Sequence, residues 1–229
     1  MKDEFNNYLN PKVLIDHHPD PETFADFTIS DTNVSSAAEI VFEFITGYSK
    51  NKILNKEIAE CLYTGIMTDT VNFRHNVSSK TFGILSILVQ QGIDTEKINS
   101  NVYDYFLKNR MNLLGYALNK KMIVLDKYNT AFIYLKNNEL KKYNFQVGDS
   151  EGFVNYPLSI KNIKFSALFI ERNDHIKISF RSKGNFFVNK FAEKHFLGGG
   201  HKNAAGGKSY DSLKITIKKF INLLSEYKD

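Results

Sequence analysis

The stretch Val13-Leu14-Ile15-Asp16-His17-His18 decides the fold class of this chain. Its three consecutive apolar residues lie between Asn10-Pro11 and Asp16, and this pattern predicts a short buried strand. Asp16, His17 and His18 then stand at the carboxyl end of that strand, which is the edge where open α/β sheets place their ligand sites. An imidazole there can bind a metal ion through one nitrogen while a carboxylate orients the other nitrogen. A pair of surface histidines after a strand is the simpler alternative.

Helical patterns follow this strand. Ser36-Ala37-Ala38-Glu39 has the spacing of a capping box and predicts a helix that ends near Gly47. A second helix is predicted from Asn55 to Asp69, and a third over residues 79–91, with Gly92 directly after it and Asp94 as the cap of the next helix. A strand followed by helices is typical of α/β folds.

The periodicity changes in the second half of the chain. Two pairs of apolar runs surround turn sequences and predict two hairpins, over residues 122–135 and 165–180. Further helices are predicted over residues 137–143, 187–195 and 212–227. We therefore expect a first domain over residues 1–107, a helical connector over 108–120, and a second, smaller α/β domain with a mixed sheet over 121–229.

One acidic residue, Asp69, lies at the predicted end of the second helix between Thr68 and Thr70. A carboxylate suits a cation such as Mn²⁺ or Mg²⁺, and we expect the flanking threonine hydroxyls to fix its rotamer. Taken alone, such a residue is more often a helix-end cap. Arg74 follows closely and is one of four arginines, so it is a candidate for binding an anionic substrate.

The glycine-rich stretch over residues 198–207 predicts an anion site. Consecutive glycines let backbone N–H groups approach a phosphate, and His201 and Lys202 add positively charged donors. A P-loop and a dinucleotide fingerprint are both excluded, because Lys202 and Asn203 stand where those motifs need glycine. Arg181 ends a predicted strand, where a guanidinium can bind a phosphate with two hydrogen bonds. The alternatives are a flexible turn before a small-residue helix, and an exposed arginine on an edge strand.

Charge is divided unevenly along the chain. Residues 1–119 contain 10 Lys/Arg and 15 Asp/Glu, a net charge of −5, whereas residues 120–229 contain 20 and 10, a net charge of +10. An acidic half suits cations and a basic half suits anions.

A single cysteine, Cys61, excludes an internal disulfide. We expect a cytoplasmic protein without a membrane partner, because no apolar run is long enough to cross a bilayer.

The order and context of these motifs resemble the DHH phosphoesterase superfamily with its DHH-associated C-terminal domain. The resemblance rests on Ile15-Asp16-His17-His18-Pro19, Gly65-Ile66-Met67-Thr68-Asp69-Thr70, Arg181-Ser182 and the glycine-rich stretch. It implies a doubly wound parallel sheet in the first domain and hydrolysis of a phosphate ester by a metal-activated water. The short architecture is similar to the bacterial oligoribonuclease and 3′-phosphoadenosine 5′-phosphate phosphatase branch.

The resemblance also implies roles for individual residues. His17 and Asp69 match metal ligands, Asp16 matches a carboxylate that supports the ligands, and His18 matches the histidine that faces the phosphate. The matching substrate-binding residues are Arg181, Ser182, Gly199, Gly200 and His201, to which we add Arg74. The implied cofactor is a pair of Mn²⁺ ions, with Mg²⁺ as an alternative, and the implied partner is a nucleotide or short oligonucleotide. The resemblance leaves open whether the chain forms a homodimer.

Two departures from the family pattern stand out. Val71 occupies a position where members have glycine, and the family's first two motifs, which precede the Asp-His-His motif, have no match in the fifteen residues before Asp16. We therefore expect a member that lacks the first half of its catalytic domain and is weakly active or inactive alone. One alternative is a RecJ-like single-strand exonuclease, which the lack of an OB-like strand set after residue 207 disfavours. Another is a non-catalytic nucleotide-binding module.

Overall fold

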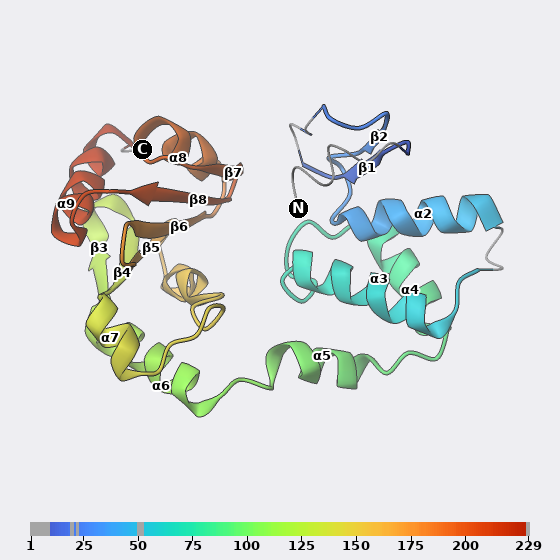
Figure 1. The fold of residues 1–229 in the computed structure, drawn as a ribbon, viewed down its shortest axis with the longest axis horizontal. Helices are drawn as coiled ribbons and strands as arrows, with labels where there is room; N and C mark the ends of the chain where they lie inside the picture. Colours follow the sequence, from blue (N-terminus) through green and yellow to red (C-terminus); the bar gives the residue numbers. More distant parts are fainter. Residues whose placement is uncertain (1–9, 19–20, 22, 50–52, 228–229) are drawn as a thin grey trace. The chain divides into compact units, whose positions relative to one another are not determined.

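The chain forms two compact units, which divide between Tyr105 and Phe106. The computed structural model in Figure 1 describes residues 10–18, 21, 23–49 and 53–227, so Pro19 of the first motif lies outside the described residues. The first unit spans Met1–Tyr105 and the second spans Phe106–Asp229. Each unit is α/β, as expected.

The strands of the first unit form a parallel pair. β1 (Val13–Asp16) is the predicted strand, and it pairs with β2 (Phe27–Ser30), which the sequence analysis did not identify. In this register Asp16 lies opposite Ser30. The parallel pairing agrees with the parallel sheet that the family resemblance implies.

Four helices make up the rest of the first unit: α2 (Ala37–Ser49), α3 (Lys56–Asp69), α4 (Ser79–Val89) and α5 (Thr95–Tyr103). The predicted helix starts are confirmed, because the side chains of Asn55, Ser78 and Asp94 each accept a hydrogen bond from the backbone three residues on. α2 continues past Gly47, its predicted end. The helices share a core that includes Leu62, Ile66, Met67, Ile84 and Leu88.

The second unit contains the predicted mixed sheet, which has six strands. Its strands are β3 (Met122–Leu125), β4 (Thr130–Leu135), β5 (Phe165–Glu171), β6 (Ile176–Ser182), β7 (Gly199–His201) and β8 (Ala204–Ser209). Their order is β3-β4-β5-β6-β8-β7, in which β4 and β5 pair parallel and the other neighbours pair antiparallel. Both predicted hairpins, β3–β4 and β5–β6, are confirmed.

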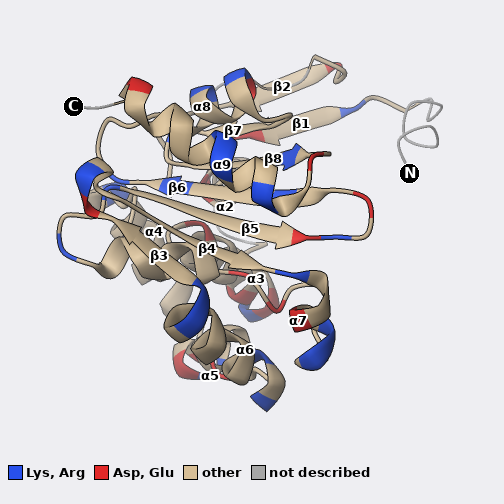
Figure 2. Ribbon diagram, turned by 90° about the vertical axis from the view of Figure 1, so that its left-hand side faces the viewer, with Lys and Arg blue, Asp and Glu red and all other residues tan. Residues whose placement is uncertain are grey.

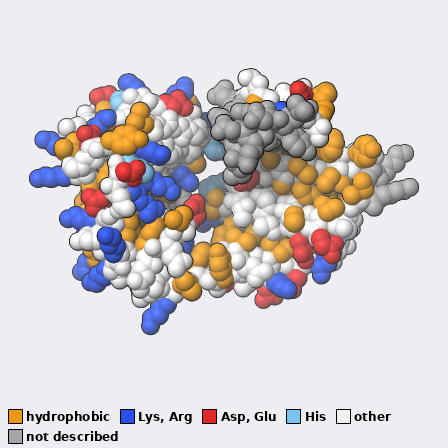
Figure 3. All heavy atoms as spheres, in the orientation of Figure 1, with side chains coloured by type: hydrophobic (Ala, Val, Ile, Leu, Met, Phe, Trp, Pro, Cys, Tyr) orange, Lys and Arg blue, Asp and Glu red, His pale blue; other side chains and the backbone are white. Residues whose placement is uncertain are grey.

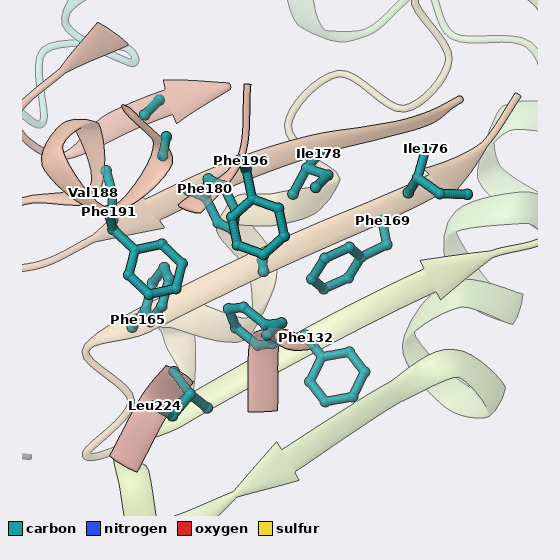
Figure 4. Close-up of a cluster of buried hydrophobic side chains, with 14 of the residues drawn as sticks. Phe132, Phe165, Phe169, Ile176, Ile178, Phe180, Val188, Phe191, Phe196 and Leu224 are labelled. Carbon is teal, nitrogen blue, oxygen red and sulfur yellow. The ribbon is translucent and has the colours of Figure 1, made fainter. Parts of the chain in front are cut away.

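One face of this sheet carries a phenylalanine-rich core. Side chains of β4, β5 and β6 meet those of α8 (Val188–His195) and α9 (Leu213–Leu223), and Figure 4 shows the rings pointing toward one another. Phe220 is fully buried, and its ring centroid lies 5.2 Å from that of Phe169 and 5.5 Å from that of Phe165. This packing fixes the positions of the strands.

The segment that we expected to connect the two domains packs on the other face of this sheet. Residues 108–120 are helical, in α6 (Lys108–Tyr116) and the π-helix Ala117–Lys121, but they do not stand between the units. Leu113 and Ala117 are fully buried in a cluster with Ile133 and Leu168 of the sheet. Helix α7 (Asn137–Lys142) and the 3₁₀ helix Phe153–Ser159 contribute to the same cluster. Apolar burial thus makes this segment part of the second unit.

The charged residues follow the division seen in the sequence. Figure 2 marks Lys and Arg on β6, β8 and the helices of the second unit, and Figure 3 shows many Lys and Arg side chains over this unit on the face in view. Within the described residues, no helix is long and apolar enough to cross a membrane.

Candidate functional site

The first unit brings His17 and Asp69 together. His17 follows β1, and Asp69 is the last residue of α3. His17 Nε2 lies 3.9 Å from Asp69 Oδ2, and the Asp69 side chain remains 46% exposed. An imidazole and a carboxylate from separate elements therefore converge where a ligand can reach both.

Asp16 orients His18. One Asp16 carboxylate oxygen accepts a hydrogen bond from the His18 backbone N–H, at 3.1 Å. The same oxygen is also hydrogen-bonded to His18 Nδ1. This side-chain hydrogen bond lowers the pKa of the Asp16 carboxyl, which stays ionised at neutral pH. Because Nδ1 is bonded to Asp16, Nε2 is the His18 nitrogen that could act on a phosphate.

Ser36 fixes the carboxylate of Asp69, a contact that the sequence analysis missed. Its hydroxyl donates a hydrogen bond of 2.7 Å to Asp69 Oδ2 and accepts one from the Ala38 backbone. Ser36 is only 2% exposed, so water competes little for this bond. The predicted role of the threonines is wrong, because the Thr68 and Thr70 hydroxyls donate to carbonyls of their own helix.

The predicted capping box is also altered. Ser36 caps the start of α2, but the Glu39 carboxylate accepts from the Ser35 backbone and hydroxyl and from the Thr81 hydroxyl. Glu39 is buried, and its hydrogen bond with Thr81 joins α2 to the first turn of α4. Gly65 allows α2 and α3 to approach closely, since a Cβ there would lie 3.0 Å from Ala38 Cβ. This close approach places Ser36 next to Asp69.

The donor atoms of His17 and Asp69 fit a divalent ion. Carboxylates suit both Mn²⁺ and Mg²⁺, while imidazole favours Mn²⁺ because it is a transition metal. The hydrogen bond from Ser36 to Asp69 is the kind of supporting contact that orients a metal ligand. His17 and Asp69 are two such donors in the first unit, and a two-ion site needs more of them.

The turn after Asp69 is strained. Val71, Asn72 and Phe73 have φ values of 52°, 58° and 62°, in the left-handed region. This conformation costs a β-branched residue such as Val71 about 1–2 kcal/mol, which explains why glycine would suit the position. Arg74 is exposed at the end of this turn, and its predicted contact with substrate stays a prediction.

In the second unit, the sheet register places Arg181 and His201 in one row. Arg181 pairs with Ala204 and Ala204 pairs with His201, so the three side chains lie on the same face of β6, β8 and β7. Arg181 is half-buried, and this burial lowers the pKa of its guanidinium. One of its nitrogens donates to the Phe180 carbonyl, which holds the side chain along the strand.

The glycine-rich stretch is a hairpin of β7 and β8, not a coiled loop or a turn before a helix. Gly199 and Gly200 lie in β7, and a Cβ on Gly200 would lie 2.7 Å from the Ala204 carbonyl oxygen. The Ser182 hydroxyl donates to the Phe186 carbonyl and accepts from Asn203. Ser182 therefore holds the β7–β8 turn in place, and its contact with phosphate stays a prediction.

Two family models match this chain. Residues 2–66 match the DHH family, N-terminal domain, and residues 127–228 match the DHHA1 domain. Among solved structures, an exopolyphosphatase-related protein from Bacteroides fragilis is similar, with a TM-score of 0.94 and 42% identity over 99% of this chain and 67% of that one.

Curated relatives are also similar. The "Probable bifunctional oligoribonuclease and PAP phosphatase NrnA" of Streptococcus mutans is 35% identical over 89% of this chain and 64% of its own length. The "Bifunctional oligoribonuclease and PAP phosphatase NrnA" of Bacillus subtilis is 30% identical over 86% of this chain and 62% of its own. The chain thus spans less than two thirds of the length of these two relatives.

Proposed function

Because the chain belongs to the DHH family, with a DHH N-terminal domain and a DHHA1 domain, we propose that it is a metal-dependent phosphoesterase. Its proposed substrates are nucleotide bisphosphates such as 3′-phosphoadenosine 5′-phosphate, and short oligoribonucleotides. The pairing of His17 with Asp69 carries this proposal, since two metal donors from separate elements converge at 3.9 Å. Relatives named as oligoribonucleases and PAP phosphatases support the substrate class.

The residues of the first unit would hold the ion and orient the phosphate. His17 and Asp69 would be metal ligands for Mn²⁺, or alternatively Mg²⁺, and Ser36 would hold one oxygen of Asp69 in place. Bound divalent ions supply a Lewis acid that stabilises the attacking and leaving oxygens of a phosphate ester. His18, held by Asp16, would present Nε2 to the phosphate.

The residues of the second unit would bind the phosphate groups of the substrate. Arg181 and His201 share one row of the sheet, and β7 and β8 present glycine and alanine backbone beside them. Charge-assisted hydrogen bonds from guanidinium to phosphate are about twice as strong as neutral ones. After β8 the described chain forms α9 instead of further strands, which gives no support to the RecJ-like alternative.

Hydrolysis by the purified 229-residue chain tests this proposal. Phosphate release from 3′-phosphoadenosine 5′-phosphate, and nucleotide release from diadenylate, would be measured with and without Mn²⁺. We expect slow turnover, because His17 and Asp69 are two donors and a two-ion site needs more. Asp69→Asn should abolish turnover. The matched control Thr68→Ala should retain it, since the Thr68 hydroxyl bonds only helix carbonyls.

Turnover without a metal ion, or turnover by Asp69→Asn equal to that of the unmodified chain, would contradict the proposal. Binding of the nucleotide without any turnover would instead support the non-catalytic nucleotide-binding alternative.

A further inference from the structure

We propose that Glu39 is a positioning residue for the metal ligand Asp69. Its buried carboxylate holds Ser35, and Ser35 in turn fixes the neighbouring Ser36, whose hydroxyl bonds Asp69. The inference deepens the proposed function and rests on it, because it takes Asp69 as a ligand of the divalent ion. It assigns to Glu39 a role in metal binding that is exerted only through other residues.

The Glu39 carboxylate is held inside the first unit by hydroxyl and backbone donors. The residue is 1% exposed. Its Oε1 accepts hydrogen bonds from the Ser35 backbone N–H at 3.3 Å, from the Ser35 hydroxyl, and from the Thr81 hydroxyl at 2.8 Å. Ser35 and Thr81 are also buried, so water competes little for these bonds. Glu39 therefore ties Ser35 to the first turns of both α2 and α4.

Ser36 passes this constraint to the proposed metal ligand. It directly follows Ser35, and its hydroxyl accepts from the Ala38 backbone N–H at 3.1 Å and donates to Asp69 Oδ2 at 2.7 Å. The close approach of α2 and α3 at Gly65 brings this hydroxyl within reach of Asp69. A shift of Ser35 would displace the backbone of Ser36, and the bond to Asp69 would lengthen with it.

Helix capping does not account for the position of Glu39. In a capping box, a glutamate at this place in the helix bonds the backbone N–H of the N-cap residue, which is Ser36 here. The Glu39 carboxylate bonds Ser35 instead. The start of α4 is already capped, because Ser78 and Thr81 bond each other reciprocally. Neither helix start requires the carboxylate as a cap.

Charge pairing does not account for Glu39 either. Among the residues that the structure describes, no basic side chain forms an ion pair with it. Lys80 of α4 is bonded to Glu43, which raises the pKa of Lys80, and Glu39 adds a smaller electrostatic contribution. Burial of a carboxylate without a paired cation costs stability, so an apolar residue would join the helices at lower cost. What the carboxylate adds to packing is a fixed geometry for Ser35 and Ser36.

Mn²⁺ titration of the full 229-residue chain, with free Mn²⁺ followed by electron paramagnetic resonance, tests this inference. Glu39→Ala should lower the Mn²⁺ affinity about tenfold, which is the usual effect of losing a supporting contact. Glu39→Gln should restore most of the affinity, because the three hydrogen bonds reach Oε1 and glutamine keeps one such oxygen.

Glu43→Ala is the matched control. It removes a carboxylate from the next turn of the same helix, but the Glu43 side chain is 47% exposed and bonds only Lys80. The Mn²⁺ affinity of this variant should stay within about twofold of the unmodified chain, since exposed ion pairs contribute little.

A double-mutant cycle separates positioning from a general loss of structure. In the Ser36→Ala background, Glu39→Ala should cause no further loss of Mn²⁺ affinity, because the contact that it supports is already absent. A purely structural defect would add to the loss in Ser36→Ala. Denaturant unfolding would confirm that each variant is folded. If Glu39→Ala does not fold, Ser35→Ala replaces it, with an expected loss of about threefold because one hydrogen bond is removed.

The outcomes separate this inference from the proposed function. Unchanged affinity in Glu39→Ala or its replacement, equal losses in Glu39→Ala and Glu39→Gln, or losses that add to that of Ser36→Ala would overturn the inference alone. A loss in Glu43→Ala as large as that in Glu39→Ala would do the same. Failure of the unmodified chain to bind Mn²⁺ would overturn the inference together with the proposed function.

Discussion

The two units position their candidate site residues by different forces. In the second unit, Arg181 lies on β6, whose alternate residues are buried in the phenylalanine-rich core, and its neighbour Phe180 is fully buried. In the first unit, the strands β1 and β2 keep large apolar side chains exposed, with Val13 at 57% and Phe27 at 62%. There the candidate ligands are held by polar contacts instead, from Ser36 to Asp69 and between Asp16 and His18. Apolar packing thus fixes the proposed phosphate site, and hydrogen bonds fix the proposed metal ligands.

The largest expected effect comes from the core of the second unit. Phe220→Ala removes a fully buried ring that contacts at least five aromatic neighbours, and should lower the free energy of unfolding by about 3–5 kcal/mol. Denaturant unfolding would measure this loss. Phe82→Ala, which changes a 53%-exposed ring on α4, should cost at most about 0.5 kcal/mol. Similar losses for the two variants would contradict the claim that buried apolar packing stabilises the second unit.

A polar cluster in the second unit gives a pH-dependent test. Burial alone would raise the pKa of Glu139, but hydrogen bonds from Lys121, from the Lys136 backbone and from Tyr116 outweigh it, so the pKa is lowered. Its contribution to stability is therefore present above the unfolded value of about 4.3 and is lost as the pH falls through the lower folded pKa. Glu139→Gln should cost about 2 kcal/mol at pH 7.

Unfolding free energies measured from pH 7 to pH 3 would check the Glu139 prediction. The difference between Glu139→Gln and the unmodified chain should shrink at the acidic end. A difference that stays constant with pH would contradict the assigned cause.

Ser36→Ala tests whether hydrogen bonds position the metal ligands of the first unit. Removing the hydroxyl frees one oxygen of Asp69, and loss of such a supporting contact typically lowers metal affinity about 10–100-fold. Mn²⁺ titration would measure this, and Ser36→Thr should restore much of the affinity because it keeps a hydroxyl. Unchanged affinity in Ser36→Ala would show that packing alone holds Asp69.

The smallest expected effect concerns the turn after Asp69. Val71→Gly should raise the free energy of unfolding by about 1 kcal/mol, because glycine adopts the left-handed conformation of this residue without steric cost. The gain is limited by the larger conformational entropy of glycine in the unfolded chain. Thermal unfolding would detect it, and a loss of stability would mean that the Val71 side chain contributes more by packing than it costs in strain.

Local signals in the sequence predicted much of this fold. Asn55 and Asp94 cap helices as expected, and Asn129, with φ of 47°, closes the β3–β4 hairpin in the predicted turn. These features depend on a few neighbouring residues, which is why sequence alone reveals them. The convergence of His17 and Asp69 followed only from the family resemblance, because no local pattern connects them.

Features that depend on distant contacts were missed or misassigned. The hydrogen bond from Ser36 to Asp69 requires the close approach of α2 and α3, which the helix pattern does not show. Strands β7 and β8 are rich in glycine, a poor strand former; β8 forms by pairing with β6, and β7 by pairing with β8. The segment over residues 108–120 resembled a connector because its burial depends on Ile133 and Leu168, which come later in the chain.

Mn²⁺ binding to variants of both units tests most directly whether the first unit supplies the metal ligands and the second supplies the phosphate contacts. Electron paramagnetic resonance would follow free Mn²⁺ during titration of the unmodified chain, Asp69→Asn and Arg181→Ala. We predict that Asp69→Asn lowers the affinity by at least about tenfold, while Arg181→Ala binds Mn²⁺ like the unmodified chain and binds 3′-phosphoadenosine 5′-phosphate more weakly. Loss of Mn²⁺ in Arg181→Ala, or unchanged Mn²⁺ affinity in Asp69→Asn, would contradict this division of roles.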